Sequence, residues 1–197
     1  YSPAAVVMPE TGELPVFPMT AIDEITTKTP DSLYNGSAVA DIIKSCVPAV
    51  KNPWEILSTD LDAILVAIRM ATNGSEMDIE TTCPKCKEES KYGVNLSMIL
   101  NNFKMGDYDA LTEVHDLKIK FKPLNYKELT DNSIRQFEIQ KSMVNLNSME
   151  QGPDREVKTS ELLRVISIST IAVLASTLEY IETPEVRVTE KEYIQIG

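Results

Sequence analysis

The feature that most constrains this chain is an apolar run of twenty residues near the C-terminal end of the sequence. Residues 162–181 read LLRVISISTIAVLASTLEYI, which is long enough to cross a bilayer as a helix. Arg164 and Glu179 lie within the run, with five Ser or Thr residues between them, and each charge is costly in lipid. A helix that is apolar on nearly all sides is typically buried in protein. We therefore predict a helix over residues 159–181 that packs against protein and does not span a membrane.

Composition and charge narrow the class of protein. The chain has 197 residues, of which 43% are apolar and 25% charged, as in an ordinary soluble globular protein. Its 19 basic and 30 acidic residues give a net charge of −11. Binding to nucleic acid or to an anionic membrane needs clustered Lys and Arg, so we expect neither as a partner. Three cysteines form no disulfide framework, which favours synthesis in a reducing cytoplasm.

The sequence divides into three parts. Residues 1–35 hold five of the eleven prolines and are predicted to form an extended arm without regular helix, because proline fixes φ and donates no hydrogen bond. Residues 36–182 form a mixed helical core domain, and residues 183–197 form a C-terminal extension that we expect to be incomplete. Apolar residues of the arm need a surface, either the protein's own core or a neighbouring subunit, and both remain open. The interface candidates are Leu14, Val16, Phe17, Met19 and Ile22.

Helical periodicity predicts the main elements of the core domain. Apolar residues at helical spacing indicate helices over residues 37–47 and 58–72, and the second is expected to be the central core helix. Asn125 followed by Glu128 is typical of a helix start, so a further helix is expected over residues 126–146.

The CPKC sequence is the most specific short motif. Apolar and polar residues alternate on both sides of it within residues 76–100, which predicts a β-hairpin with Cys83 and Cys86 in its turn. Two thiolates at this spacing can bind one metal ion, but a closed structural zinc site needs four ligands. The chain offers only Cys46 and His115 as further Cys or His residues. Three alternatives stay open: a zinc ion bound within one chain, a metal shared between two subunits, and a reduced pair or a disulfide without metal.

No pattern indicates an enzyme. A redox-active CxxC motif normally begins a helix after a strand, whereas the flanks here indicate two strands. His115 has no recognisable nucleophile paired with it, and no Gly-rich phosphate loop is present in the sequence. We assign no catalytic residue and no cofactor other than a possible structural zinc. The fold class that we predict is α+β: a mainly helical domain with a small β-hairpin bearing the CxxC turn, and an extended proline-rich N-terminal arm.

Several segments together resemble one family. They are GELPVFPMTAIDEITTKTPDSLYNGSAVADIIKSCVP (residues 12–48), LSTDLDAILVAIRMATNGSEMDIETTCPKCKE (57–88) and FKPLNYKELTDNSIRQFEIQK (121–141). In their order and spacing they look like the baseplate hub subunits of T-even-type, contractile-tailed bacteriophages. The segment DLDAILVAIRMAT, leading into the CPKC turn, carries most of the resemblance. In that family the CxxC turn resembles half of a zinc ribbon, but a second cysteine pair is not evident in this sequence.

The resemblance implies a non-enzymatic protein of the virion or of its assembly. We expect a structural component of the tail baseplate, in or next to the central hub, which joins neighbouring subunits through protein contacts. Its implied partners are other baseplate or hub proteins, with several copies in a symmetric assembly. Its implied locations are the host cytoplasm, where it is made, and the baseplate of the virion. The alternatives are a hub assembly chaperone absent from the finished particle and a zinc-ribbon-like protein adaptor.

Overall fold

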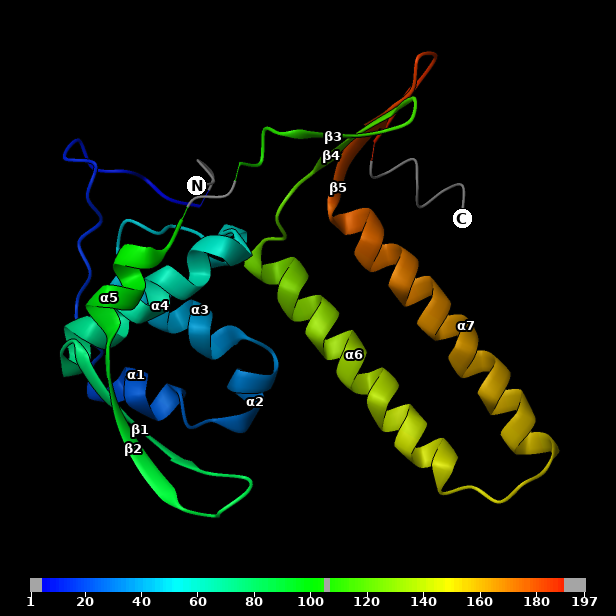
Figure 1. Ribbon diagram of the computed structural model, residues 1–197, viewed down its shortest axis with the longest axis horizontal. Helices are drawn as coiled ribbons and strands as arrows, with labels where there is room; N and C mark the ends of the chain where they lie inside the picture. Colours follow the sequence, from blue (N-terminus) through cyan, green and yellow to red (C-terminus); the bar gives the residue numbers. More distant parts are fainter. Residues whose placement is uncertain (1–4, 105–106, 190–197) are drawn as a thin grey trace. The chain divides into compact units, whose positions relative to one another are not determined.

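The computed structural model describes residues 5–104 and 107–189 (Figure 1). In these residues the chain forms seven α-helices, one 3-10 helix and six strands, which confirms the α+β class. The chain divides into two compact units, Tyr1–Met105 and Gly106–Gly197. This grouping differs from the arm, core and extension that we expected, because the arm belongs to the first unit. Residues 183–189 of the expected extension belong to the second unit, and residues 190–197 lie outside the described residues.

Helix α3 lies at the centre of the first unit. It contacts α1, α2, the 3-10 helix η1 and α4, and it buries Ile42, Ile43 and Cys46. Helix α4, which we expected to be central, fully buries only Leu61 and Ile68. That expectation was wrong because apolar residues on the other sides of α4 are only partly covered. The helices of this unit are α1 (Ala21–Thr26), α2 (Pro30–Tyr34), α3 (Ser37–Cys46), η1 (Pro53–Glu55), α4 (Ser58–Asn73) and α5 (Leu96–Asn102).

Two short helices, α1 and α2, lie within the proline-rich arm, so the prediction of an arm without regular helix was wrong for its second half. Thr20 and Asp23 form a capping box that starts α1. Pro30 occupies the first position of α2, where its missing N–H costs no helical hydrogen bond. The proline content of this segment predicted that it would contain no helix, but Pro30 begins one.

The arm residues described before α1 have no regular helix and are attached to their own unit. Val6 forms an antiparallel bridge with Val50. The Phe17 N–H donates to the carbonyl oxygen of Cys46 at 2.8 Å, and the Met19 N–H donates to Thr72 Oγ1 at 2.9 Å. These bonds fix the backbone of the arm against the end of α3, the segment that follows it, and α4.

Strands β1 (Glu76–Thr82) and β2 (Glu89–Asn95) form an antiparallel hairpin in the first unit. Its register runs from Glu76 opposite Asn95 to Thr82 opposite Glu89, and the connecting turn contains Cys83 and Cys86. Most of its side chains are exposed on both faces. A two-stranded hairpin with little apolar packing is marginal in water, so this element has weak support from its own unit.

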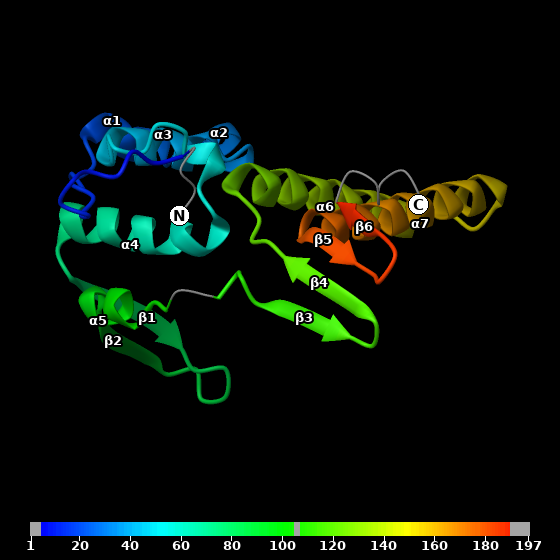
Figure 2. The same ribbon diagram turned by 90° about the horizontal axis from the view of Figure 1, so that it is seen from above.

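The second unit is an antiparallel sheet with a helical hairpin inserted in it. The strands are β3 (Leu111–Val114), β4 (Leu117–Phe121), β5 (Leu178–Glu182) and β6 (Arg187–Thr189), in the spatial order β3-β4-β5-β6 (Figure 2). Helices α6 (Tyr126–Asn147) and α7 (Pro153–Ser176) connect β4 to β5 and run antiparallel to each other (Figure 1). The Lys122 N–H donates to the Thr177 carbonyl at 2.9 Å, which closes the base of this helical hairpin.

The start of α6 confirms the predicted capping pair. Asn125 Oδ1 accepts from the Glu128 N–H at 2.8 Å, and Glu128 Oε2 accepts from the Asn125 N–H at 2.9 Å. Helix α7, in contrast, ends at Ser176 rather than at residue 181. The prediction was wrong here because Leu178 and Ile181 pair with Phe121 and Ile119 of β4, which recruits the last apolar residues into the sheet.

Helix α7 is also far less covered than we predicted. Its most apolar 18-residue window has a mean hydropathy of 1.4, yet only 11% of that window is buried. Among the described residues, α7 is the one helix long and apolar enough to cross a membrane. One such helix is weak evidence of a membrane span, because core helices of soluble proteins meet the same criteria. Its contacts with α6 and β5 cover one side only, so this chain supplies only part of the protein packing that we predicted for the helix.

Candidate functional site

The CPKC turn carries two cysteines that could bind a metal ion or react, and backbone hydrogen bonds hold its conformation. The Cys83 N–H donates to the Glu88 carbonyl at 2.9 Å, and the Lys87 N–H donates to the Cys83 carbonyl at 2.9 Å. Lys87 adopts a left-handed backbone conformation with φ of 61°, which lets the chain reverse within a few residues. The turn thus holds both cysteines at the tip of the β1–β2 hairpin.

The backbone of this turn stabilises a thiolate. The N–H groups of Cys86 and Lys85, in that order of effect, point at the Cys83 sulfur and lower the pKa of its thiol, with help from the Cys86 side chain. A thiolate held by backbone N–H groups is a better nucleophile and a better metal ligand than an ordinary thiol. The turn therefore offers half of a tetrahedral thiolate site.

The other two candidate ligands lie in different surroundings. Cys46 is fully buried on α3, where burial, followed by the nearby Asp23 carboxylate, raises the pKa of its thiol. His115 lies in the exposed turn between β3 and β4, with a left-handed φ of 56°. Within the described ranges, no three His, Cys, Asp or Glu side chains are grouped to hold a metal ion. Zinc binding by this chain stays a prediction.

The candidate interface residues of the arm fall into two groups. Phe17 is 52% exposed and Ile22 is 75% exposed, whereas Leu14, Val16 and Met19 are partly covered. The first two are free to contact a neighbour, and the other three contribute to packing within the first unit.

Two further exposed apolar residues lie close to Ile22 in the sequence. Ile25 follows it by three positions on α1, and Leu33 lies on α2. Residues three apart share one side of a helix. The spacing of Ile22 and Ile25 was the signal in the sequence, but it depends on a helix that we did not expect.

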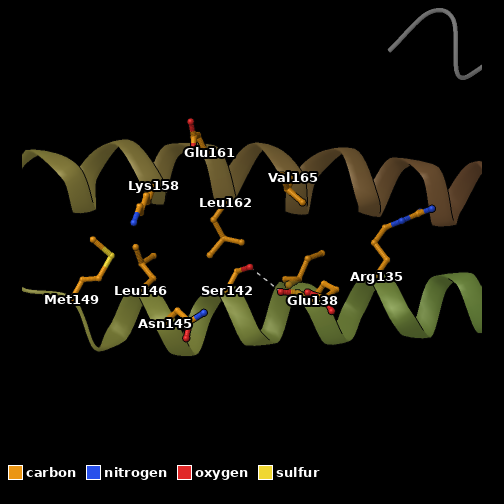
Figure 3. Close-up of a pocket in the computed structure, with 11 residues that line it drawn as sticks. Arg135, Glu138, Ser142, Asn145, Leu146, Met149, Lys158, Glu161, Leu162 and Val165 are labelled. Carbon is orange, nitrogen blue, oxygen red and sulfur yellow. Dashed lines mark hydrogen bonds between the residues drawn. The ribbon is translucent and has the colours of Figure 1, made fainter. Parts of the chain in front are cut away.

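A groove of about 450 Å³ runs between α6 and α7 (Figure 3). Figure 3 shows Leu162 and Leu146 pointing into the space between the two helices, with Met149 at one end. Charged side chains of both signs lie along its edges, and the Ser142 hydroxyl donates to the Glu138 carbonyl at 2.9 Å. This apolar floor with a mixed polar edge is suited to contact with protein side chains. The charged lining residues are Arg135, Glu138, Lys158 and Glu161.

Helix α7 presents many exposed apolar side chains. Six of its large apolar residues are between 49% and 60% exposed: Val157, Leu163, Val165, Ile168, Ile171 and Leu174. Exposed apolar side chains in this number indicate a site of protein or membrane interaction. The sequence signal was present in the apolar run of residues 162–181, but periodicity could not tell which side of the helix another element would cover.

Comparison with known proteins gives one match. A family model described as T4 bacteriophage base plate protein matches residues 16–194 of the chain. This match spans both compact units and includes the arm helices, the CPKC turn and the helical hairpin. No curated protein and no solved structure matches the chain significantly.

Proposed function

Because this chain belongs to the family of T4 bacteriophage base plate proteins, we propose that it is a non-enzymatic structural subunit in or next to the central hub of a contractile tail. The protein is a component of the tail baseplate of the virion. Its role there is to join neighbouring baseplate proteins through protein contacts, without nucleic acid or membrane as a partner. Several copies take part in a symmetric assembly.

The observation that carries this proposal is the presence of uncovered apolar surface on both compact units. The first unit presents Phe17 and Ile22, and the second presents the exposed side of α7. A subunit that joins two neighbours needs two separate contact surfaces, and apolar residues at their centres contribute most of the binding energy. The net charge of −11 keeps the free subunit soluble before it binds.

Cys46 and His115 support a structural role better than a catalytic one. Cys46 is buried with a raised pKa, which disfavours the thiolate that a nucleophile requires. His115 lies in an exposed turn of the second unit, whereas the thiols lie in the first. We therefore assign no catalytic residue.

A structural zinc between two subunits is the one cofactor that we propose for test. The CPKC turns of two copies would together supply the four thiolates of a closed site. Metal analysis of the purified chain separates the alternatives: about half a zinc per chain indicates a shared site, about one indicates a site within the chain, and near zero indicates a reduced pair or a disulfide without metal. A value near one would favour the zinc-ribbon-like adaptor.

The function itself is tested on purified virions. Quantitative mass spectrometry should find this chain in a low, fixed ratio to a tail protein of known copy number. Absence from particles combined with presence in infected lysate would contradict the structural role and indicate an assembly chaperone.

A paired substitution tests the arm surface within the same experiment. Phe17→Ser combined with Ile22→Ser should lower incorporation into virions without unfolding the chain, because both side chains are exposed. Val144→Ser is the matched control, since Val144 is 68% exposed but lies on α6. Equal incorporation of the two variants would contradict a role of the arm in joining subunits.

A further inference from the structure

Helix α7 carries two lines of residues with alternating spacings of four and three, the spacing of a coiled coil. The line that faces α6 includes Thr159, Leu162, Ile166, Ser169 and Val173, which are buried or partly buried. The second line is separated from the first by helical spacing and consists of exposed residues, and we call it the outer seam. It consists of Val157, Glu161, Arg164, Ile168 and Ile171, all of them exposed.

We propose that the outer seam binds the outer seam of a second copy of this chain, with the two α7 helices antiparallel. This inference deepens the proposed structural role, on which its meaning in the baseplate rests, because it identifies one partner. The two helical hairpins would then form one bundle of helices in which α7 is covered on both sides.

Charge complementarity selects this partner and this direction. Two antiparallel helices related by a twofold axis can bring Glu161 of each copy opposite Arg164 of the other, which gives two ion pairs in the dimer. The same alignment brings Val157 opposite Ile168. Neither Glu161 nor Arg164 has an ion-pair partner elsewhere in residues 5–104 and 107–189, so both are available for these contacts.

Other alignments of the same two helices are less favourable. A parallel pair related by a twofold axis places Glu161 against Glu161 and Arg164 against Arg164, which is repulsive. An antiparallel pair shifted by one heptad places Glu161 against Ile171 and Arg164 against Ile168, so that both charges lose water without gaining a partner. Polar pairs within an apolar seam are an established way to fix register and direction in coiled coils.

A lipid bilayer is a poorer occupant of the outer seam. Glu161 and Arg164 lie in the middle of the exposed apolar residues, and moving either charge into lipid is costly. A second copy pairs both charges and places Val157 against Ile168 on either side of them, while Ile171 lies opposite Asp154 at the end of the contact. A contact between single helices is smaller than a standard stable interface of roughly 800 Å² per partner, so we expect association at roughly micromolar concentrations.

The test uses the purified full chain and its sedimentation equilibrium. The chain should be largely dimeric at about 200 µM and largely monomeric near 1 µM. Glu161→Arg or Arg164→Glu alone should weaken the dimer at least roughly tenfold, because each places like charges opposite each other. The double variant E161R/R164E should restore it. Glu156→Arg is the matched control, with the same change of charge off the seam, and should leave the dimer unchanged.

Mixing the two single variants separates contacts between chains from contacts within one helix. Glu161 and Arg164 are three residues apart, so the double variant could also restore a pair within α7. A mixture of E161R and R164E chains should form a heterodimer, although each variant alone is monomeric. Circular dichroism confirms that each variant is folded.

Three results would overturn the inference. They are a monomer at every concentration, a dimer that E161R leaves unchanged, and flotation of the chain with phosphatidylcholine vesicles while it remains monomeric. The failure of this inference is distinct from failure of the proposed function. If virions contain the chain but the purified chain stays monomeric, only the dimer inference fails. If the purified chain is dimeric but virions lack it, only the proposed structural role fails.

Discussion

Replacing Asp23 by Ala should detach helix α1 from α3 and destabilise the first unit. One oxygen of this carboxylate, Oδ2, accepts three hydrogen bonds. They come from the Thr20 N–H at 2.7 Å, the Thr20 hydroxyl at 2.7 Å and the Ser45 hydroxyl at 3.1 Å. Asp23 is only 8% exposed, so water cannot replace these bonds without opening the structure. The carboxylate therefore closes the capping box of α1 and ties it to the central helix.

The expected loss follows from these contacts. A hydrogen bond to a charged group contributes a net of about 1.5–3 kcal/mol, and bonds that converge on one atom are not additive. We expect Asp23→Ala to lower the free energy of unfolding of the first unit by about 2–4 kcal/mol. Asp23→Asn keeps the shape but loses the charge, so about half of that loss is expected.

The pH dependence of this effect has a definite sign. Burial alone raises the pKa of Asp23, but the hydrogen bonds from the Thr20 N–H, the Thr20 hydroxyl and the Ser45 hydroxyl outweigh it, and the pKa is lowered overall. A carboxyl with a lowered pKa in the folded state contributes stability above its unfolded pKa of about 3.9. That contribution is lost as the pH falls through the folded pKa. The difference between the native chain and Asp23→Asn should therefore shrink below about pH 4.

Trp54 provides the assay, because it is the only tryptophan of the chain and lies in η1 of the first unit. Urea unfolding followed by its fluorescence reports the stability of that unit. Glu24→Ala is the matched control: it is the next acidic residue of α1 and is exposed. A loss for Asp23→Ala no larger than that of the control, or a difference that stays constant down to pH 3, would refute this reasoning.

Three further predictions concern the core, the thiols and the helical hairpin. Ile43→Ala should cost about 2–5 kcal/mol of unfolding free energy in the Trp54 assay, because Ile43 is fully buried at the centre of α3. Cys46 should react with a soluble disulfide reagent at pH 7 at least roughly a hundredfold more slowly than Cys83, since it is buried with a raised pKa whereas that of Cys83 is lowered. Ser169→Ala should raise the stability of the α6–α7 hairpin by about 1 kcal/mol, measured by thermal unfolding of the helical signal, because its hydroxyl is buried without a hydrogen-bond partner.

Each of these three has a control and a contrary result. Ile25→Ala removes the same side-chain atoms from a site that is 66% exposed, and an equal loss there would contradict the assignment of the core. Ser167→Ala removes an exposed hydroxyl that donates to the Leu163 carbonyl at 2.9 Å, and should not stabilise the hairpin. Rapid labelling of Cys46 in the folded chain would contradict its burial on α3.

Local signals in the sequence predicted the elements whose ends depend on nearby residues. The start of α6 is determined by Asn125 and Glu128, three positions apart, and both hydrogen bonds of that box are present. The extents of α3 and α4 likewise follow from apolar spacing within each segment. The positions of the two cysteines between β1 and β2 follow from alternation on either side of the turn.

Long-range contacts determined what the sequence could not predict. Residues 178–182 are apolar enough for the end of a helix or for a strand, and pairing with β4 makes them a strand. The side of α7 that α6 covers depends on which partner the fold brings to it, and so does the exposure that makes the outer seam a candidate site. In the same way, Cys46 and His115 were candidate ligands only because the sequence offered no others. Their places on α3 and in the β3–β4 turn depend on the whole fold.

Helices α6 and α7 are inserted between two neighbouring strands, so the length of this helical hairpin can change without changing the sheet that supports it. Phe121 and Leu178 are paired, so the helices leave and return at one place whatever their length. Each seven residues added to both helices would extend the hairpin by about 10 Å and keep every side chain on its present side. The hairpin is in this sense an adjustable spacer, whose span changes in steps of whole heptads while β4 and β5 stay paired.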